Sequence, residues 1–130
     1  MWSILNNQLL YEITFGNSVY DLVIGREGTP LANRIVSLSR EGILRISAVE
    51  TGDEVKTIKF DKECFSMAVD ESQTVIAVGT RNSITFIDST NYTKVKEVSF
   101  NYRIDSLAFN KRNDCMIAVT LYGQVHSIKF

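Results

Sequence analysis

The sequence predicts an all-β protein built from repeated four-stranded units, and three observations support this fold class. Apolar residues come in short runs rich in β-branched side chains, with polar turns between them, a pattern typical of strands. No window sustains the apolar stripe of a helix. Similar segments also recur 41 residues apart and end at Ile46, Ile87 and Ile128. A fixed period of this length is characteristic of repeat proteins.

Each repeat contains four expected strands in the same order. The first strands open four residues after a phenylalanine, at Val19, Cys64 and Ile104. The expected first strands cover 21–24, 66–69 and 106–109, the second strands 34–39, 75–80 and 116–120, and the third strands 43–47, 84–88 and 125–129. The expected fourth strands cover 12–15, 57–60 and 97–100. Four strands in about 40 residues correspond to one β-propeller blade.

The chain resembles the WD-repeat family of propellers along essentially all of its 130 residues. Residues 37–52 are similar to that family's second and third strands, and residues 65–70 to its first strand. The family's Gly-His and Trp-Asp pairs are absent, and the third strands end in Ile46-Ser47, Ile87-Asp88 and Ile128-Lys129. The resemblance therefore implies a degenerate propeller. Its blades would depend on apolar packing, because the family's His–Ser–Asp–Trp hydrogen-bond network cannot form.

The repeat boundaries predict a single partial propeller domain over residues 1–130. Residues 1–15 would carry an orphan outer strand, 16–60 and 61–100 two complete blades, and 101–130 a blade lacking its outer strand. Three blades should not close alone, since propeller rings have about four to eight. Each bare end would present about 350 Å² of flat sheet face, and the last blade an unpaired strand edge.

Three arrangements would cover these surfaces. The chain is part of a longer propeller protein, or it forms a two-fold dimer, or it docks onto another protein that supplies the missing blades. In the dimer, the strand at 9–15 of each chain would complete the other chain's last blade, and the joints would bury about 1,400 Å². The predicted assembly edge consists of Leu9, Leu10, Ile13, Phe15, Val125 and Ile128.

Composition is that of a soluble globular protein, with 45% hydrophobic and 22% charged residues and a net charge of −1. The near-neutral charge argues against a nucleic-acid surface. The N-terminus lacks the features of a secretory signal, and no apolar run is long enough to span a membrane. We therefore expect an intracellular protein, cytoplasmic or nuclear, in which Cys64 and Cys115 are reduced thiols.

An insertion separates the first and second strands of the first full blade, over residues 25–33. Two glycines and the only proline of the chain mark it as a loop. It is either a tolerated surface insertion or a contact for a specific partner.

Catalytic and metal-binding patterns are weak throughout. The only histidine, His126, lies inside an expected strand without placeable Ser and Asp partners. The cysteines and this histidine match no zinc spacing, and no phosphate-binding glycine motif occurs. Carboxylates are scattered through turns, where they are usually solvated. We therefore predict no enzyme activity, no cofactor and no metal.

An interaction surface has better support. In a propeller, the loops before the first strand and between the second and third strands form one face of the ring. These loops carry the candidate partner-binding residues Arg40, Arg81, Tyr102, Arg103 and Tyr122. Arginine and tyrosine are enriched at binding hot spots, and arginines one blade apart could hold an acidic or phosphorylated peptide. RNA stacking on Tyr92, Tyr102 and Tyr122 beside Arg103 or Lys94 is the rival interpretation.

The sequence thus predicts a non-catalytic scaffold or adaptor that mediates protein–protein interactions and completes a propeller by dimerisation or with a partner. The alternative is a propeller module that binds a small ligand, a glycan or RNA. The expected inner strands are apolar, with Leu22, Val23, Met67, Ala68, Leu107 and Ala108. This composition argues against a polar central channel.

Overall fold

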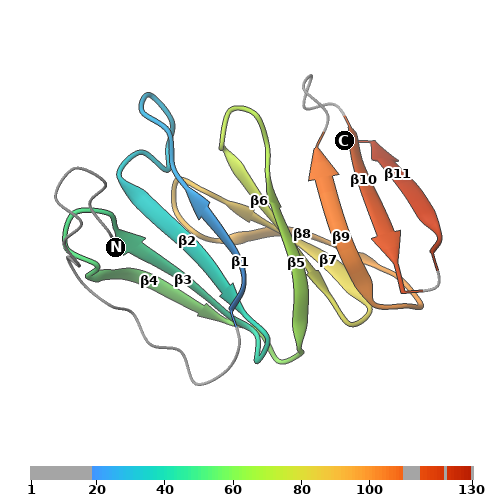
Figure 1. Cartoon of the computed structure of the whole chain (residues 1–130). Helices are drawn as coiled ribbons and strands as arrows, with labels where there is room; N and C mark the ends of the chain where they lie inside the picture. The colour runs from blue at the N-terminus through green and yellow to red at the C-terminus, as the bar shows by residue number, and fades with distance from the viewer. Residues whose placement is uncertain (1–18, 110–114, 122, 130) are drawn as a thin grey trace, which may run out of the picture.

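The computed structural model describes residues 19–109, 115–121 and 123–129. Three antiparallel sheets stand side by side in an open arc (Figure 1). The first blade contains β1 (Val19–Ile24), β2 (Arg34–Ser39), β3 (Ile43–Ala48) and β4 (Glu54–Lys59). The second contains β5 (Cys64–Val69), β6 (Val75–Thr80), β7 (Ser83–Asp88) and β8 (Lys94–Ser99). The third contains β9 (Ile104–Phe109), β10 (Cys115–Thr120) and β11 (Val125–Lys129).

This architecture confirms the predicted fold class, because each sheet is a meander of consecutive antiparallel strands. The fourth strands were predicted too late in the chain: β4 and β8 end one residue before Phe60 and Phe100. The amide of Phe60 donates to Gly42 O (2.7 Å) and that of Phe100 to Asn82 O (2.7 Å). These residues therefore close the blade against the neighbouring turn and do not extend the strand. The strand predicted over residues 9–15 lies outside the described residues.

A repeated backbone irregularity supports the equivalence of the blades. The pairing of each inner strand with its neighbour shifts register near the strand's start, between Val19 and Asp21 and again between Cys64 and Ser66. In the third blade the shift falls between Val119 and Thr120, opposite the start of β9. Such bulges increase the local twist of a strand. The repeat seen in the side chains thus has a counterpart in the backbone.

Apolar packing between blades forms two cores. The core between the first and second blades contains Leu31, Val36, Leu38, Leu44, Ile46, Cys64, Met67, Ile76, Val78 and Ile87. The core between the second and third blades contains Ala77, Ile84, Phe86, Ile104, Leu107, Met116 and Ala118. The inner strand β9 packs directly against β5. This is the apolar contact between sheets that the sequence resemblance implies.

The insertion at residues 25–33 is part of the first core. Its Leu31 is fully buried there. The insertion also reaches the β5–β6 turn of the second blade, where Gln73 Oε1 accepts from Arg26 N (2.8 Å) and Thr29 Oγ1 (2.9 Å). The loop therefore joins two blades, a structural role that neither alternative drawn from the sequence included.

The two ends of the arc expose apolar strand residues. On β1, Leu22 is 55% and Ile24 53% exposed, and on the last strand β11 Val125 is 67% exposed. In the described part of the chain, β11 has no partner on its outer side. No helix among the described residues is long and apolar enough to cross a membrane.

Candidate functional site

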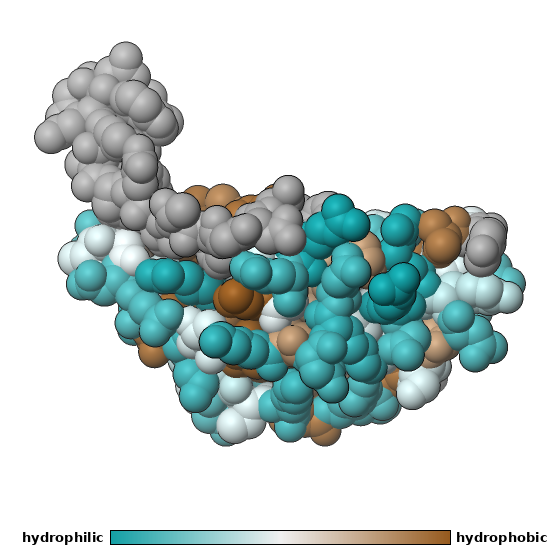
Figure 2. Space-filling view, turned by 90° about the horizontal axis from the view of Figure 1, so that it is seen from below, coloured by the Kyte–Doolittle hydropathy of each residue, from teal (hydrophilic) through white to brown (hydrophobic). Residues whose placement is uncertain are grey.

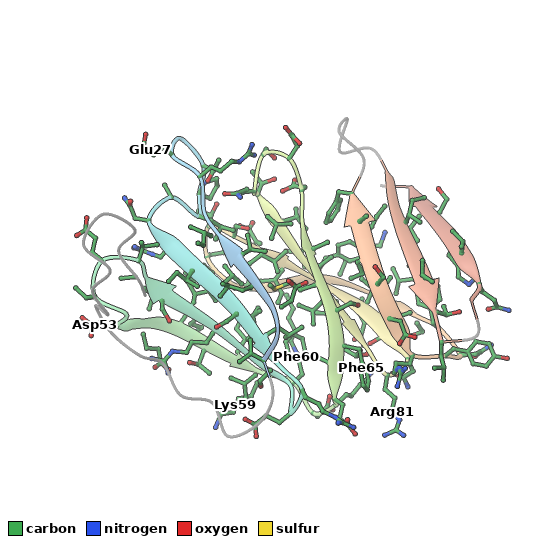
Figure 3. All side chains as sticks on the ribbon, in the orientation of Figure 1. Glu27, Asp53, Lys59, Phe60, Phe65 and Arg81 are labelled. Atoms are coloured by element: carbon green, nitrogen blue, oxygen red, sulfur yellow. The ribbon has the colours of Figure 1, made fainter. Side chains whose placement is uncertain are left out.

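The loops at the lower edge of the arc in Figure 1 form one face of the molecule. They follow β2, β4, β6, β8 and β10. Figure 2 looks onto this face and shows mainly hydrophilic residues over it. Figure 3 places Phe65 and Arg81 at this edge and Glu27 at the opposite one.

A cavity of about 430 Å³ opens on this face and receives side chains from all three blades. Its lining consists of Arg40, Glu63, Phe65, Arg81, Asn82, Asn101, Tyr102, Arg103 and Leu121. We call it the arginine hollow. Four of the predicted partner-binding residues line it, namely Arg40, Arg81, Tyr102 and Arg103. The fifth, Tyr122, lies outside the described residues.

Glu63 joins the arginines of two blades. Its Oε2 accepts from Arg40 Nε at 3.1 Å, and its Oε1 lies 3.5 Å from Arg81 Nη1. Arg40 follows β2 of the first blade and Arg81 follows β6 of the second, at the same position of the repeat. One carboxylate therefore holds two guanidinium groups side by side at the mouth of the hollow.

Arg103 forms the third corner of the hollow. Its Nε donates to Asp105 Oδ1 at 2.5 Å, and its guanidinium lies 4.7 Å from the centre of the Phe65 ring. Backbone hydrogen bonds also fix the loops of the site: Cys64 N donates to Arg40 O (3.2 Å) between the first two blades, and Leu121 N donates to Arg103 O (2.9 Å) within the third blade. The arginines are thus presented from anchored loops.

The site combines positive charge with access to solvent. Three arginines face two carboxylates, those of Glu63 and Asp105. The side chains of Arg40 and Arg81 are 52% and 72% exposed. Guanidinium groups are planar donors suited to carboxylate and phosphate. The hollow can therefore accept an anionic group from solution.

Sequence reasoning missed Glu63 and Phe65 as members of the site. The position of Glu63 directly before the first strand of a blade could have indicated it, because that loop belongs to the same face as Arg40. Of the residues named for RNA stacking, Tyr102 and Arg103 line the hollow. By contrast, Tyr92 packs against the first core, and Lys94 Nζ lies 4.8 Å from the centre of the Phe60 ring. Neither lines the hollow.

The other residues considered for catalysis or metal binding, His126 and Cys64, are held in packing contacts. His126 packs edge-on against Phe100, with ring centroids 5.2 Å apart. Burial raises the pKa of the Cys64 thiol to about 12, against the opposing effect of Lys94 and Lys62, which disfavours a reactive thiolate. Over residues 19–109, 115–121 and 123–129, no group of three His, Cys, Asp or Glu side chains could hold a metal ion.

Comparison with known proteins defines the fold class. The chain matches no protein-family model and no curated protein. It is similar to the computationally designed Ika4 protein, with TM-score 0.83, 17% identity, and coverage of 99% of this chain and 77% of Ika4. It is also similar to the computationally designed Ika8 protein, with TM-score 0.82, 17% identity, and coverage of 99% of this chain and 39% of Ika8.

A natural structure shows the same likeness. For the β-propeller domain of Cps50 (Swd1) from Myceliophteria thermophila, the TM-score is 0.75 at 12% identity, covering 90% of this chain and 37% of that chain. The chain thus spans less than half of the Ika8 and Cps50 structures. The likeness shows that the molecule is a set of propeller blades, whereas membership of the WD-repeat family stays a prediction.

Proposed function

We propose that this chain is a non-catalytic interaction module, a scaffold or adaptor, whose arginine hollow binds an acidic or phosphorylated segment of a protein partner. The observation that carries the proposal is the convergence of Arg40, Arg81 and Arg103 from different blades on one cavity. Arginine and aromatic side chains around a partly enclosed hollow are typical of binding hot spots.

Glu63 gives the site a defined resting state. With no anion bound, its carboxylate partly neutralises Arg40 and Arg81 and keeps them together. A guanidinium group carries five N–H donors, and the side chains of Arg40 and Arg81 are both largely exposed. A partner carboxylate or phosphate can therefore bind beside Glu63 without taking its place, and the arrangement lowers the entropy lost on binding.

The experiment compares matched peptides on the purified chain. One labelled peptide is made in phosphorylated, glutamate-substituted and neutral forms, and binding is followed by fluorescence anisotropy. We expect the anionic forms to bind and the double variant Arg40→Ala/Arg81→Ala to weaken them by about tenfold or more, which corresponds to about 1.4 kcal/mol.

The control variant is Lys56→Ala/Lys96→Ala. It removes the same charge from exposed positions on the outer strands β4 and β8. Equal affinity of the two double variants would overturn the proposal. A single-stranded RNA probe serves as the second arm: tighter binding than any peptide, with a steep salt dependence, would favour the nucleic-acid alternative instead.

The proposal includes completion of the open arc by a second copy or by a partner protein. The exposed β1 face and the outer edge of β11 support it, because exposed apolar faces and unpaired strands favour association.

A further inference from the structure

Two pockets occupy equivalent positions of the repeat. The first pocket, between the first and second blades, has a volume of about 290 Å³ and is lined by Lys59, Phe60, Asp61, Lys62, Thr80, Ser83, Thr85, Lys94 and Glu97. The second pocket, between the second and third blades, has about 230 Å³ and is lined by Ser99, Phe100, Asn101, Tyr102, Thr120, Gln124 and His126. In the repeat, Phe60 corresponds to Phe100 and Thr80 to Thr120.

In the first pocket, Lys62 and Thr80 form hydrogen bonds with neighbouring side chains. Lys62 Nζ donates to Asn82 Oδ1 (2.9 Å), Ser83 Oγ (3.4 Å) and Glu97 Oε1 (3.4 Å). Thr80 Oγ1 lies 2.7 Å from Ser83 Oγ and 3.2 Å from Ser83 O. The fourth strand of the blade, β8, supplies Glu97, and the acid completes the network.

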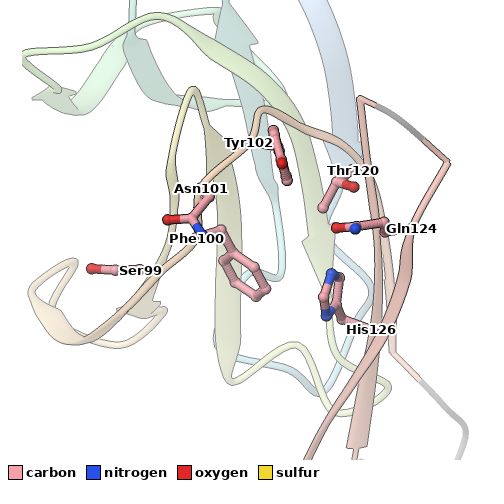
Figure 4. Close-up of a pocket in the computed structure, with 7 residues that line it drawn as sticks. All are labelled: Ser99, Phe100, Asn101, Tyr102, Thr120, Gln124 and His126. Atoms are coloured by element: carbon pink, nitrogen blue, oxygen red, sulfur yellow. The ribbon is translucent and has the colours of Figure 1, made fainter.

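The second pocket differs in its buried hydroxyl. Thr120 is only 2% exposed, yet its Oγ1 has no hydrogen-bond partner within the described part of the chain. Tyr102 stands at the position of Lys62, and Gln124 at that of Ser83. Figure 4 shows Thr120, Gln124 and His126 on one side of this pocket and Ser99, Phe100 and Asn101 on the other. An unpaired buried hydroxyl costs about 1–3 kcal/mol, so the pocket is suited to a further polar group.

A fourth strand on β11 would deliver that group. In the second blade, Glu97 of β8 is paired with Thr85 of β7, and both line the first pocket. His126 of β11 holds the position of Thr85 and lines the second pocket. Directly paired residues of antiparallel strands project to the same face. A strand added to β11 would therefore direct the side chain opposite His126 into the second pocket.

The chain itself contains a segment with the matching sequence. Residues 12–15, Glu-Ile-Thr-Phe, align with residues 97–100, Glu-Val-Ser-Phe. In this alignment Glu12 corresponds to Glu97, so in an added strand it would be opposite His126. Ile13 would then be opposite Val125, which is 67% exposed. Both the acid and the apolar cover are thus encoded at the required spacing.

We propose that residues 9–15 of a second copy of this chain pair with β11, and that the Glu12 carboxylate enters the second pocket. This inference rests on the dimer form of the proposed function and names the residues that make its joint. The carboxylate would accept hydrogen bonds from Thr120 Oγ1, the Gln124 amide and the His126 ring. None of the described residues that line the pocket is acidic, so no lining carboxylate would repel it. Strand addition of this kind combines backbone pairing with a side-chain pocket.

The test measures the mass of the full chain by light scattering across a dilution series. We expect the wild type to approach twice 14.7 kDa. Glu12→Lys should weaken the dimer by about tenfold or more, and His126→Glu should do the same, because it places two acids in one pocket. The exchanged variant Glu12→His/His126→Glu should recover the dimer. Glu27→Lys, at the opposite edge, makes the same charge change as Glu12→Lys and should leave the mass unchanged.

His126 provides a second readout as the only histidine of the chain. Its ring resonances in proton NMR should move on dilution of the wild type and stay fixed in Glu12→Lys. A monomeric wild type, or a dimer indifferent to Glu12→Lys, would overturn the inference. Arg40→Ala/Arg81→Ala must leave the dimer intact, so a failure of peptide binding and a failure of this joint give different results.

Discussion

The two joints between neighbouring blades place large and small side chains at equivalent positions in reversed order. At the first joint, Leu38 of β2 and Cys64 of β5 both belong to the core. At the second joint, the equivalent positions carry Gly79 of β6 and Ile104 of β9. The large side chain lies on the earlier blade in one joint and on the later blade in the other. Packing is therefore specified across each joint and not within each repeat.

At the second joint the blades approach each other closely at Gly79, where the first joint has a large side chain. A Cβ placed on Gly79 would lie 2.1 Å from Ser66 Oγ and 2.9 Å from Ile104 Cβ. The space is so small because Ser66 Oγ donates to the buried Ile104 O at 2.8 Å. The first joint instead gains Leu31 from the inserted loop. One joint is held by added apolar volume and the other by contact of backbone and hydroxyl.

At neutral pH the largest effect is expected for Gly79→Leu. The added side chain must displace Ser66 and Ile104, which costs about 3 kcal/mol of unfolding free energy. The double variant Gly79→Leu/Ile104→Cys gives the second joint the pair found in the first, and it should recover at least about 1 kcal/mol relative to the sum of the single changes. Urea denaturation of all variants measures this coupling. Strictly additive losses would contradict pairwise packing.

The next prediction concerns the pH dependence of the unfolding free energy. Only the first joint has a titratable group at this position, because Cys64 is replaced by Ile104 in the second joint. Burial raises the pKa of the Cys64 thiol from 9.0 to about 12, so the folded chain keeps a proton that the unfolded chain loses. The stabilisation is complete below pH 9 and falls as pH rises towards 12, by up to about 1.4 kcal/mol per pH unit. Denaturation of wild type and Cys64→Ala across this range measures the difference. Parallel pH profiles would contradict it.

A smaller effect distinguishes the two pockets. Thr80→Val removes a hydroxyl bonded to Ser83 and should cost about 1 kcal/mol. Thr120→Val removes the equivalent hydroxyl, which has no partner among the described residues, and should be neutral or stabilising by up to about 1 kcal/mol. Both changes are nearly isosteric, so each variant controls the other. Because the proposed dimer would give Thr120 a partner, both variants are compared at concentrations where light scattering gives the mass of one chain. Equal losses would show that Thr120 has a partner in solution.

Much of the fold could be predicted because the strands recur in the same order in each blade and are rich in β-branched residues. The errors lie where an apolar residue leaves its strand. Phe60 and Phe100 resemble strand residues but pack into the pockets between blades. Leu31 stands in a loop marked by glycine and proline, so local signals conceal that it belongs to the core.

The site was predictable to the extent that it follows the repeat. Arg40 and Arg81 share a repeat position, and residues at one position of the repeat lie on the same face of a propeller. Their link through Glu63 depends on how closely two blades approach, and no spacing in the sequence reports that distance. The two pockets show the same limit. Thr80 and Thr120 are the same residue at one position of the repeat, but only the hydroxyl of Thr80 has a hydrogen-bond partner among the described residues.

The smallest expected effect separates the arginine hollow from the joints. Arg81→Ala removes an ion pair at 3.5 Å whose arginine side chain is 72% exposed, and exposed pairs contribute little to stability. We expect the unfolding free energy to change by less than about 0.5 kcal/mol, while binding of an anionic peptide weakens. Thr85→Ala, at a buried position of β7, is the structural comparison. If Arg81→Ala instead lost more than about 1 kcal/mol, the bridge through Glu63 would be holding the blades together, and the hollow would belong to the architecture and not to recognition.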